Sequence, residues 1–181
     1  MIYLWRVQAL VAVFIPIKTF NTVRMGIPSD QQANRLHRLC KGVIAKDSSI
    51  RFAGIANQMG KLVEAAYREG LQPLMDRQET EHYTVQTVLR ASTRETFENK
   101  IGKQRYAIAV YEKLIRATVP IAIIGHQHDK DEKQKKQQQE KQDFKWFYLL
   151  ISFDLGRDVM SIVEDKILPL IKQFQRDSLV A

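Results

Sequence analysis

The segment that most constrains the fold is a ten-residue apolar run near the C-terminus, FKWFYLLISF at residues 144–153. A strand with one face in water alternates apolar and polar residues, whereas a nearly continuous apolar run is typical of a strand covered on both faces. We therefore expect residues 144–153 to form a central strand that is buried on both faces or nearly so. A chain built around such a strand has a sheet at its core.

Four other segments have the composition of strands. Two short apolar segments, residues 50–56 and 61–68, flank a glycine-containing turn and predict a β-hairpin. Residues 104–110 alternate between apolar and polar positions, and residues 114–124 are largely β-branched and apolar, which predicts a second hairpin. Pro120 lacks an N–H group, so we expect an edge or a bulge at that position.

Two helices are predicted, one before the first of these strands and one after the last. In residues 29–46 apolar side chains recur at spacings of three and four, and Ser29 with Gln32 forms a capping-box pattern at the start. Residues 156–174 show the same apolar spacing on one face. Pro169 cannot donate to the carbonyl of the residue four positions earlier, so we expect a kink in this last helix.

A third helix is predicted in the middle of the chain. Asp76 and Glu79 form a capping box, and Gly102 is a typical helix stop, so we expect one long helix over residues 76–101. Its apolar stripe drifts through Val85, Val88, Leu89, Phe97 and Ile101, and leaves Tyr83 and Ala91 off that stripe. A drifting stripe indicates that the helix has two contact surfaces.

The domain organisation follows from two segments that belong to none of the predicted helices and strands. Residues 1–24 form an apolar leader that either packs on the domain or lies upstream of a natural start at Met25. Residues 129–142 contain only Asp, Glu, Lys and Gln, which cannot form a core. We therefore predict one α+β domain over residues 25–181 with a charged, low-complexity insertion at 126–143. Residues 1–17 are shorter than a membrane-spanning helix, and attachment to a membrane through them is the less favoured alternative.

The net charge of +8 does not by itself indicate a nucleic-acid partner. Three of these units fall in residues 1–24, and five are spread over residues 25–128, where acidic and basic residues alternate. Phosphate binding needs cations concentrated on one surface. A weak nucleic-acid-binding protein is therefore an alternative and not the main hypothesis.

Few residues in the sequence suggest catalysis or metal binding. The single Cys40 lies on an apolar helical stripe, which favours a buried structural thiol and an intracellular, cytoplasmic setting. His126 and His128 could hold a metal ion with Asp129 or His82, but no cysteine or second spaced pair supports this. No nucleophile, base and oxyanion donor can be assembled, so we expect neither enzyme activity nor a cofactor.

Three arginines in the middle of the chain are candidates for contact with an acidic partner or a nucleotide phosphate. They are Arg90, Arg94 and Arg105. The competing interpretation is ordinary solvated charge on the protein surface.

The order of elements is helix, two strands, long helix, three strands, final helix. This order resembles the roadblock/dynein-light-chain-like family, within the wider profilin-like and longin-like group. The stretches 50–68, 100–121 and 158–174 are also similar to a set of small archaeal proteins of that shape. The resemblance covers roughly residues 29–174 without the insertion, and it implies an α+β fold with a five-stranded antiparallel sheet.

The resemblance also implies a role. Members of this family are non-catalytic; their subunits pair through the long middle helix and an adjacent edge strand, and the joined surface binds or regulates small Ras-like GTPases. For this chain it implies a homodimeric adaptor or regulator of a small GTPase or signalling partner. The interface residues that we expect on the corresponding elements, residues 76–101 and 104–112, are Tyr83, Thr87, Ala91, Arg94, Tyr106, Ile108 and Val110.

A PAS-like sensor is the alternative scaffold, because it also has a five-stranded antiparallel sheet. Such a domain ordinarily places several short helices between its second and third strands, whereas one long helix is predicted here. A small-ligand-binding function remains open on this alternative, although no cluster of polar residues in the sequence marks a pocket.

Overall fold

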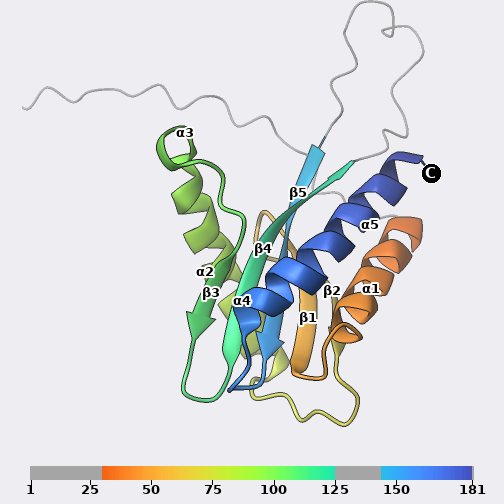
Figure 1. Ribbon diagram of the computed structural model, residues 1–181, viewed down its shortest axis with the longest axis vertical. Coiled ribbons are helices and arrows are strands. Elements are labelled where there is room, and N and C mark those ends of the chain that lie inside the picture. Colours follow the sequence, from red (N-terminus) through yellow and green to blue (C-terminus); the bar gives the residue numbers. More distant parts are fainter. Residues whose placement is uncertain (1–29, 125–143, 181) are drawn as a thin grey trace, which may run out of the picture.

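A five-stranded antiparallel sheet organises the described residues, which are 30–124 and 144–180 of the computed structural model (Figure 1). The strands are β1 (Ile50–Asn57), β2 (Leu62–Tyr67), β3 (Ala107–Val110), β4 (Ile115–Ile124) and β5 (Phe144–Phe153). Their order across the sheet is β2-β1-β5-β4-β3, and every neighbouring pair is antiparallel. The predicted fold class and the order of elements are confirmed.

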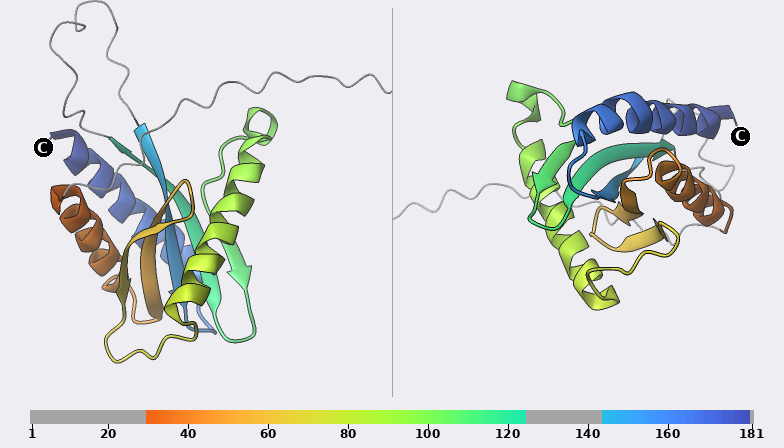
Figure 2. Two further views of the ribbon diagram at one scale, coloured as in Figure 1. Left: turned by 180° about the vertical axis from the view of Figure 1, so that it is seen from behind. Right: turned by 60° about the horizontal axis from the view of Figure 1, so that its bottom comes forward.

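Helices cover both faces of the sheet. They are α1 (Asp30–Ile44), α2 (Arg77–Glu95), α3 (Glu98–Ile101), α4 (Val159–Ser161) and α5 (Leu168–Val180), with a π-helical segment, Ile162–Ile167, between the last two. Figure 2 shows α1, α4 and α5 on one face and α2 alone on the other. The molecule therefore has three layers, with the sheet in the middle.

The last strand in the chain, β5, is the central strand of the sheet. It pairs with β1 on one edge and with β4 on the other, and its residues 147–153 are all buried. On one face, Leu149, Ile151 and Phe153 join the larger core under α1 and α5. On the other face, Tyr148 and Leu150 join a smaller core under α2. The prediction from the apolar run is confirmed.

The predicted single helix over residues 76–101 is wrong at its C-terminal end. The capping box of Asp76 and Glu79 starts α2 as predicted, but α2 ends at Glu95 and the short α3 follows. The hydroxyls of Ser92 and Thr93 donate to carbonyls three residues earlier in the chain. The helix ends where the N–H of Phe97 donates to the carbonyl of Arg94, three residues earlier, instead of to the carbonyl four residues earlier.

The C-terminal helix contains a π-helical segment directly before Pro169. The N–H of Leu168 donates to the carbonyl of Val163, five residues earlier, as expected for this geometry. The next residue is proline, which has no N–H group and crowds the preceding turn. The irregularity that we expected at Pro169 therefore takes the form of a wider helical turn.

Pro120 lies in β4 beyond the last residue that β3 pairs. The pairing of β3 with β4 covers only residues 115–118 of β4, and Pro120 is paired with Tyr148 of β5 on the other side. Because β3 is short, β4 forms the local edge of the sheet at Pro120. The expectation of an edge at this proline is confirmed.

A tight turn joins β1 to β2 and touches α2. The side-chain oxygen of Asn57 accepts hydrogen bonds from the N–H groups of Met59 and Lys61, and Gly60 has a φ of 76°. A Cβ on Gly60 would lie 2.5 Å from the Cα of Val85 in α2. Glycine is therefore needed here both for its backbone conformation and for the close approach of the helix.

We expect Gly60→Ala to lower the free energy of unfolding by about 2 kcal/mol, since it combines left-handed backbone strain with a backbone collision. Gly70→Ala is the matched control: Gly70 has a φ of 69°, but nothing lies within 4 Å of the added Cβ. It should cost about 1 kcal/mol from backbone strain alone. Urea unfolding followed by circular dichroism measures both values, and equal losses would contradict the close contact with α2.

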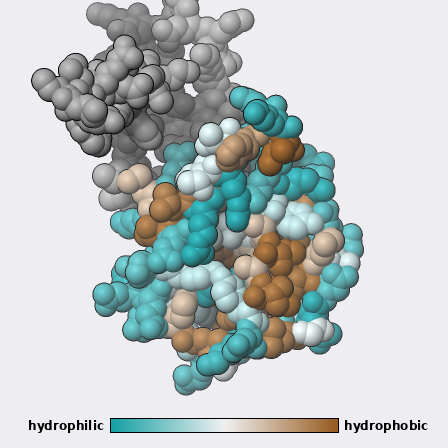
Figure 3. Space-filling view, turned by 90° about the vertical axis from the view of Figure 1, so that its left-hand side faces the viewer, coloured by the Kyte–Doolittle hydropathy of each residue, from teal (hydrophilic) through white to brown (hydrophobic). Residues whose placement is uncertain are grey.

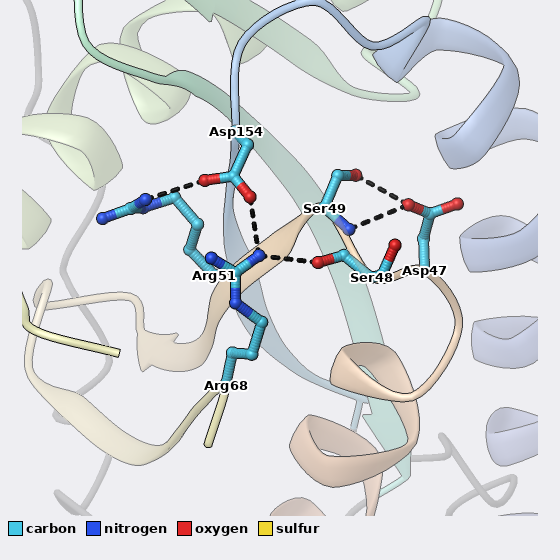
Figure 4. Close-up of polar contacts among 6 residues, drawn as sticks. All are labelled: Asp47, Ser48, Ser49, Arg51, Arg68 and Asp154. Carbon is cyan, nitrogen blue, oxygen red and sulfur yellow. Dashed lines mark hydrogen bonds and ion pairs between the residues drawn. The ribbon is translucent and has the colours of Figure 1, made fainter. Parts of the chain in front are cut away.

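An ion-pair cluster connects the end of β5 to β1 and to the end of β2 (Figure 4). Asp154 follows β5 and accepts hydrogen bonds from Arg51 of β1 at 2.7 Å and from Arg68, directly after β2, at 2.6 Å. Arg68 also donates to the backbone carbonyl of Ser48 at 2.6 Å. Arg68, and to a smaller extent Arg51, hold the pKa of Asp154 below its usual range, against the opposing effect of partial burial.

We expect Asp154→Asn to destabilise the fold by on the order of 1 kcal/mol at neutral pH, a modest value because solvent screens the pair. A carboxyl with a lowered pKa in the folded state adds stability above its unfolded pKa, about 4, and loses it as the pH falls through the folded pKa. The difference between wild type and variant should therefore shrink below about pH 4. Urea unfolding at a series of pH values tests this, and a difference that is constant with pH would contradict it.

Two predicted segments lie outside the described residues. The apolar leader over residues 1–24 and the charged insertion at 126–143 are not described, so the domain limits of 25–181 stay a prediction. The strands on either side of the insertion in the sequence, β4 and β5, pair as far as Ile124 and Phe144. Within the described residues, no helix has the length and apolar character needed to span a membrane.

Candidate interaction surface

Helix α2 contacts its own sheet through a narrow strip. Thr84, Val88 and Ala91 are its buried residues, and they face Phe52 and Tyr148 of the smaller core. Burial of Thr84 leaves no polar group unsatisfied, because its hydroxyl donates to the carbonyl of Thr80 at 2.7 Å. The remaining surface of a 19-residue helix is accessible for other contacts.

The apolar stripe predicted for this helix is therefore only partly correct. Of its members, Val88 packs on the sheet, whereas Val85, Leu89, Phe97 and Ile101 are exposed. The contact face instead includes Thr84 and Ala91, which are small or polar and carry little weight in a hydrophobicity pattern. The expectation of two different surfaces on the helix agrees with these exposures.

A groove of about 120 Å³ runs between α2 and β3. It is lined by five of the seven residues predicted for the interface, which are Tyr83, Thr87, Ala91, Arg94 and Ile108. Figure 3 faces this side of the molecule and shows apolar side chains near its centre, surrounded by hydrophilic ones. The structure thus brings most of the predicted residues together on one surface.

The other two predicted residues lie apart from the groove. Tyr106 precedes β3, is partly buried against the larger core, and donates its hydroxyl proton to Glu164 at 2.8 Å. Val110 ends β3 and is 73% exposed. Ile108 also packs partly against the larger core, so the apolar alternation in this segment marks the side facing that core.

Sequence reasoning missed the residues of β3 that lie between the predicted ones. Ala107 and Ala109 line the groove and pair with Thr118 and Arg116 of β4, which line it too. The available signal was the two-residue period of a strand, since positions that alternate with core residues face the opposite side. Small alanines there allow another chain to approach closely.

The outer edge of β3 has no strand beside it within the described residues. β3 is the last strand in the sheet order and pairs only with β4. An edge strand presents unpaired N–H and C=O groups that can bind a further strand. Together with the exposed Val110, this edge is suited to continue the sheet into another chain.

Positive charge is concentrated in the groove. Arg90, Arg94 and Arg116 line it, no acidic residue does, and none of the three forms an ion pair within residues 30–124 and 144–180. Arg90 donates to the side-chain oxygen of Gln86 at 3.2 Å, and Arg116 lies 3.9 Å from the ring centre of Tyr83. Arg105, the third arginine suggested by the sequence, is instead paired with Glu164 at 2.6 Å.

A pair of tyrosines closes one end of the groove. The hydroxyls of Tyr83 on α2 and Tyr111 after β3 lie 2.9 Å apart and share a hydrogen bond. This bond raises the pKa of Tyr111, with partial burial adding to the effect. The pair links α2 to the β3–β4 turn.

The candidate chemical residues form no site in the described parts of the chain. No group of three metal-ligating side chains is present there, and His82 is exposed on α2 next to Gln86. His126 and His128 lie outside the described residues. Cys40 is buried, and burial raises the pKa of its thiol to about 12, so it is a structural residue as predicted.

Comparison with known proteins places the fold. No family model matches the sequence, and no curated protein matches it. The gliding protein MglB of Thermus thermophilus is similar in structure, with 9% identity, a TM-score of 0.56, and coverage of 82% of this chain and 92% of that chain. The Roadblock/LC7 domain of Streptomyces avermitilis has 11% identity, a TM-score of 0.51, and coverage of 81% of this chain and 98% of that chain.

The chain has a roadblock-like fold. MglB of Myxococcus xanthus also shares it, with 14% identity, a TM-score of 0.51, and coverage of 83% of this chain and 89% of that chain. The roadblock-like fold agrees with the resemblance inferred from the order of elements.

Proposed function

We propose that this chain is a non-catalytic interaction module that pairs with a second copy through the edge of β3, and that the paired form binds a small GTPase. The observation that carries the proposal is the outer edge of β3, which no other described strand pairs, beside an open, arginine-lined groove. The corresponding elements serve pairing and GTPase binding in the family that the sequence resembles.

The surface of β3 supports pairing with a second copy. A two-fold axis beside β3 would place the same strand of both copies side by side and extend the sheet across the pair. Ala107 and Ala109 leave room above the strand for a helix of the partner, and Val110 offers apolar area at its end. Assembly also occurs on this fold, since one solved MglB structure is described as having a tetrameric arrangement.

The groove arginines support an acidic partner. Guanidinium groups without a carboxylate partner among the described residues gain charge-assisted hydrogen bonds when an acidic surface docks on them. Arg90 and Arg94 lie one helical turn apart on α2, so they can contact the same acidic patch. We assign this patch to a small Ras-like GTPase. A cytoplasmic setting and a domain over residues 25–181 accompany this proposal.

Binding of a small Ras-like GTPase to the full chain tests the proposal. We expect the charge reversal Arg90→Glu with Arg94→Glu to weaken binding at least about tenfold, because two attractive contacts become repulsive. The control is Arg77→Glu, at an almost fully exposed cation on the first turn of α2 away from the groove. It should stay within about twofold of wild type.

Biolayer interferometry at two salt concentrations measures these affinities. Equal binding by the double variant and by wild type would contradict a role for the groove. Absence of binding to any small GTPase, together with salt-sensitive binding to nucleic acid, would replace this function by the nucleic-acid alternative.

A further inference from the structure

A second cavity lies beside the groove and has a different character. It has a volume of about 230 Å³ and is enclosed by the start of α2, the loop before it, the β3–β4 turn and the face of the sheet below. Phe52, Leu71, Pro73, Leu74, Met75 and Leu114 supply its apolar walls. For comparison, a cavity of about 150 Å³ with apolar walls accommodates benzene, so this one has room for an aromatic ring and a short substituent.

The charges around this cavity have one sign. Arg51, Lys113 and Arg116 line it, and no aspartate or glutamate does. Arg51 is neutralised by Asp154, but Lys113 and Arg116 form no ion pair within the described residues. The cavity therefore presents an excess of positive charge to anything that enters it.

Arg116 is the residue of the cavity that is best placed to bind a carboxylate. It projects from β4, is partly buried, and its guanidinium lies over the ring of Tyr83 at 3.9 Å from the ring centre. Its one hydrogen-bond contact among the described residues is with the sulfur of Met75 at 3.9 Å, a weak acceptor. A partly buried guanidinium that contacts only a ring and a thioether can form stronger hydrogen bonds with a carboxylate. It can bind the two carboxylate oxygens in a bidentate geometry.

Polar groups for orientation lie near that arginine. Ser152 on β5 is only 4% exposed and lines the cavity, as do Thr80 and the hydroxyl-bearing Tyr83 and Tyr111. Ligand sites typically combine apolar walls with a few convergent polar groups of this kind. A larger cavity near Trp146, of about 530 Å³, lacks this bias because Glu95 and Glu98 line it together with three cations.

We propose that the 230 Å³ cavity binds a small organic acid, with its carboxylate on Arg116 and its ring or short alkyl body among the apolar walls. The opposite charge at Arg116 and Lys113 selects an anion, and the volume limits the body to about one ring. This site is separate from the pairing edge of β3. It shares Tyr83, Tyr111 and Arg116 with the groove, so these three residues form the wall between the two.

The probe for this proposal is phenylacetate, and the matched control ligand is phenylacetamide, which has the same shape without the charge. Isothermal titration of the full chain should give a Kd of about 1 mM or tighter for phenylacetate. The amide should bind at least about tenfold more weakly, because it lacks the charge-assisted bonds to Arg116. Equal affinities for acid and amide, or no saturation by the acid, would overturn the proposal.

A variant pair assigns the binding to this cavity. Arg116→Gln should weaken phenylacetate at least about tenfold, whereas Arg77→Gln, which removes the same charge outside the cavity, should leave it within about twofold. Should Arg116→Gln fail to fold, amide chemical shifts of wild type decide: Thr80 and Ser152 should move on titration. Unchanged affinity in Arg116→Gln, or shifts confined to other elements, would overturn the site. Self-association, followed by light scattering in the same samples, reports on the proposed pairing independently.

Discussion

Phe153→Ala is expected to lower the free energy of unfolding by about 4 kcal/mol, the largest single-residue effect that the structure predicts. Phe153 ends the central strand, is fully buried, and pairs in register with Ile50 of β1 and Ile115 of β4. Truncation would leave a cavity in the larger core, and three strands held by their hydrogen-bond pairing cannot close around it.

The matched control for this prediction is Phe97→Ala. Phe97 lies between α2 and α3 and is 58% exposed, so the same truncation should cost less than about 0.5 kcal/mol. Urea unfolding at equal protein concentration gives both values. A loss at Phe153 no larger than the loss at Phe97 would show that β5 is not the centre of the core.

The central strand and the two hairpins could be predicted from sequence because their signals are local. Ten nearly continuous apolar residues specify burial on both faces, and Asn57 with Gly60 specifies the first turn. The end of α2 could not be predicted in this way. Serine and threonine are compatible with a helix on average, so Ser92 and Thr93 do not mark an end. The bond from the N–H of Phe97 to the carbonyl of Arg94 depends on the folded structure.

The candidate interface was predicted in part. Tyr83, Thr87 and Arg94 lie together in the groove, but Tyr106 is directed toward Glu164. The prediction selected the apolar positions of this segment. Two of them, Tyr106 and Ile108, pack partly against the chain's own core, whereas Val110 is exposed. The alanines between them carry no hydrophobic signal, so only the two-residue period of a strand indicates that they face α2.

The cavity proposed to bind an organic acid could not be predicted from the sequence. Its cations come from three positions, Arg51, Lys113 and Arg116, which are separated by up to 65 residues and look like ordinary surface charge. Proximity arises only when the antiparallel sheet brings β1, β4 and β5 together. A cluster of this kind depends on tertiary structure, so no local sequence pattern indicates it.

Val110→Lys is expected to weaken self-association about thirtyfold, which corresponds to about 2 kcal/mol. Val110 is already 73% exposed, so the change should alter the stability of the single chain very little. In a two-fold pair the substitution occurs twice near the axis, and it removes apolar contact and introduces like charges on both copies. Lysine also blocks edge-to-edge pairing of strands in general.

The control for this variant is Met160→Lys on α4, which changes a 59% exposed apolar residue outside β3. It adds the same charge, so a general effect of net charge on association would appear in both variants. Sedimentation velocity over a dilution series gives the dissociation constants. The same weakening in both variants would contradict a contact at β3.

Pairing of two copies through β3 is tested most directly by sedimentation velocity of the unmodified chain. Pairing through β3 predicts a species of twice the chain's mass at about 50 µM that dissociates on dilution, as expected for an interface of moderate size. A single species of one chain's mass at every concentration up to about 200 µM would contradict it.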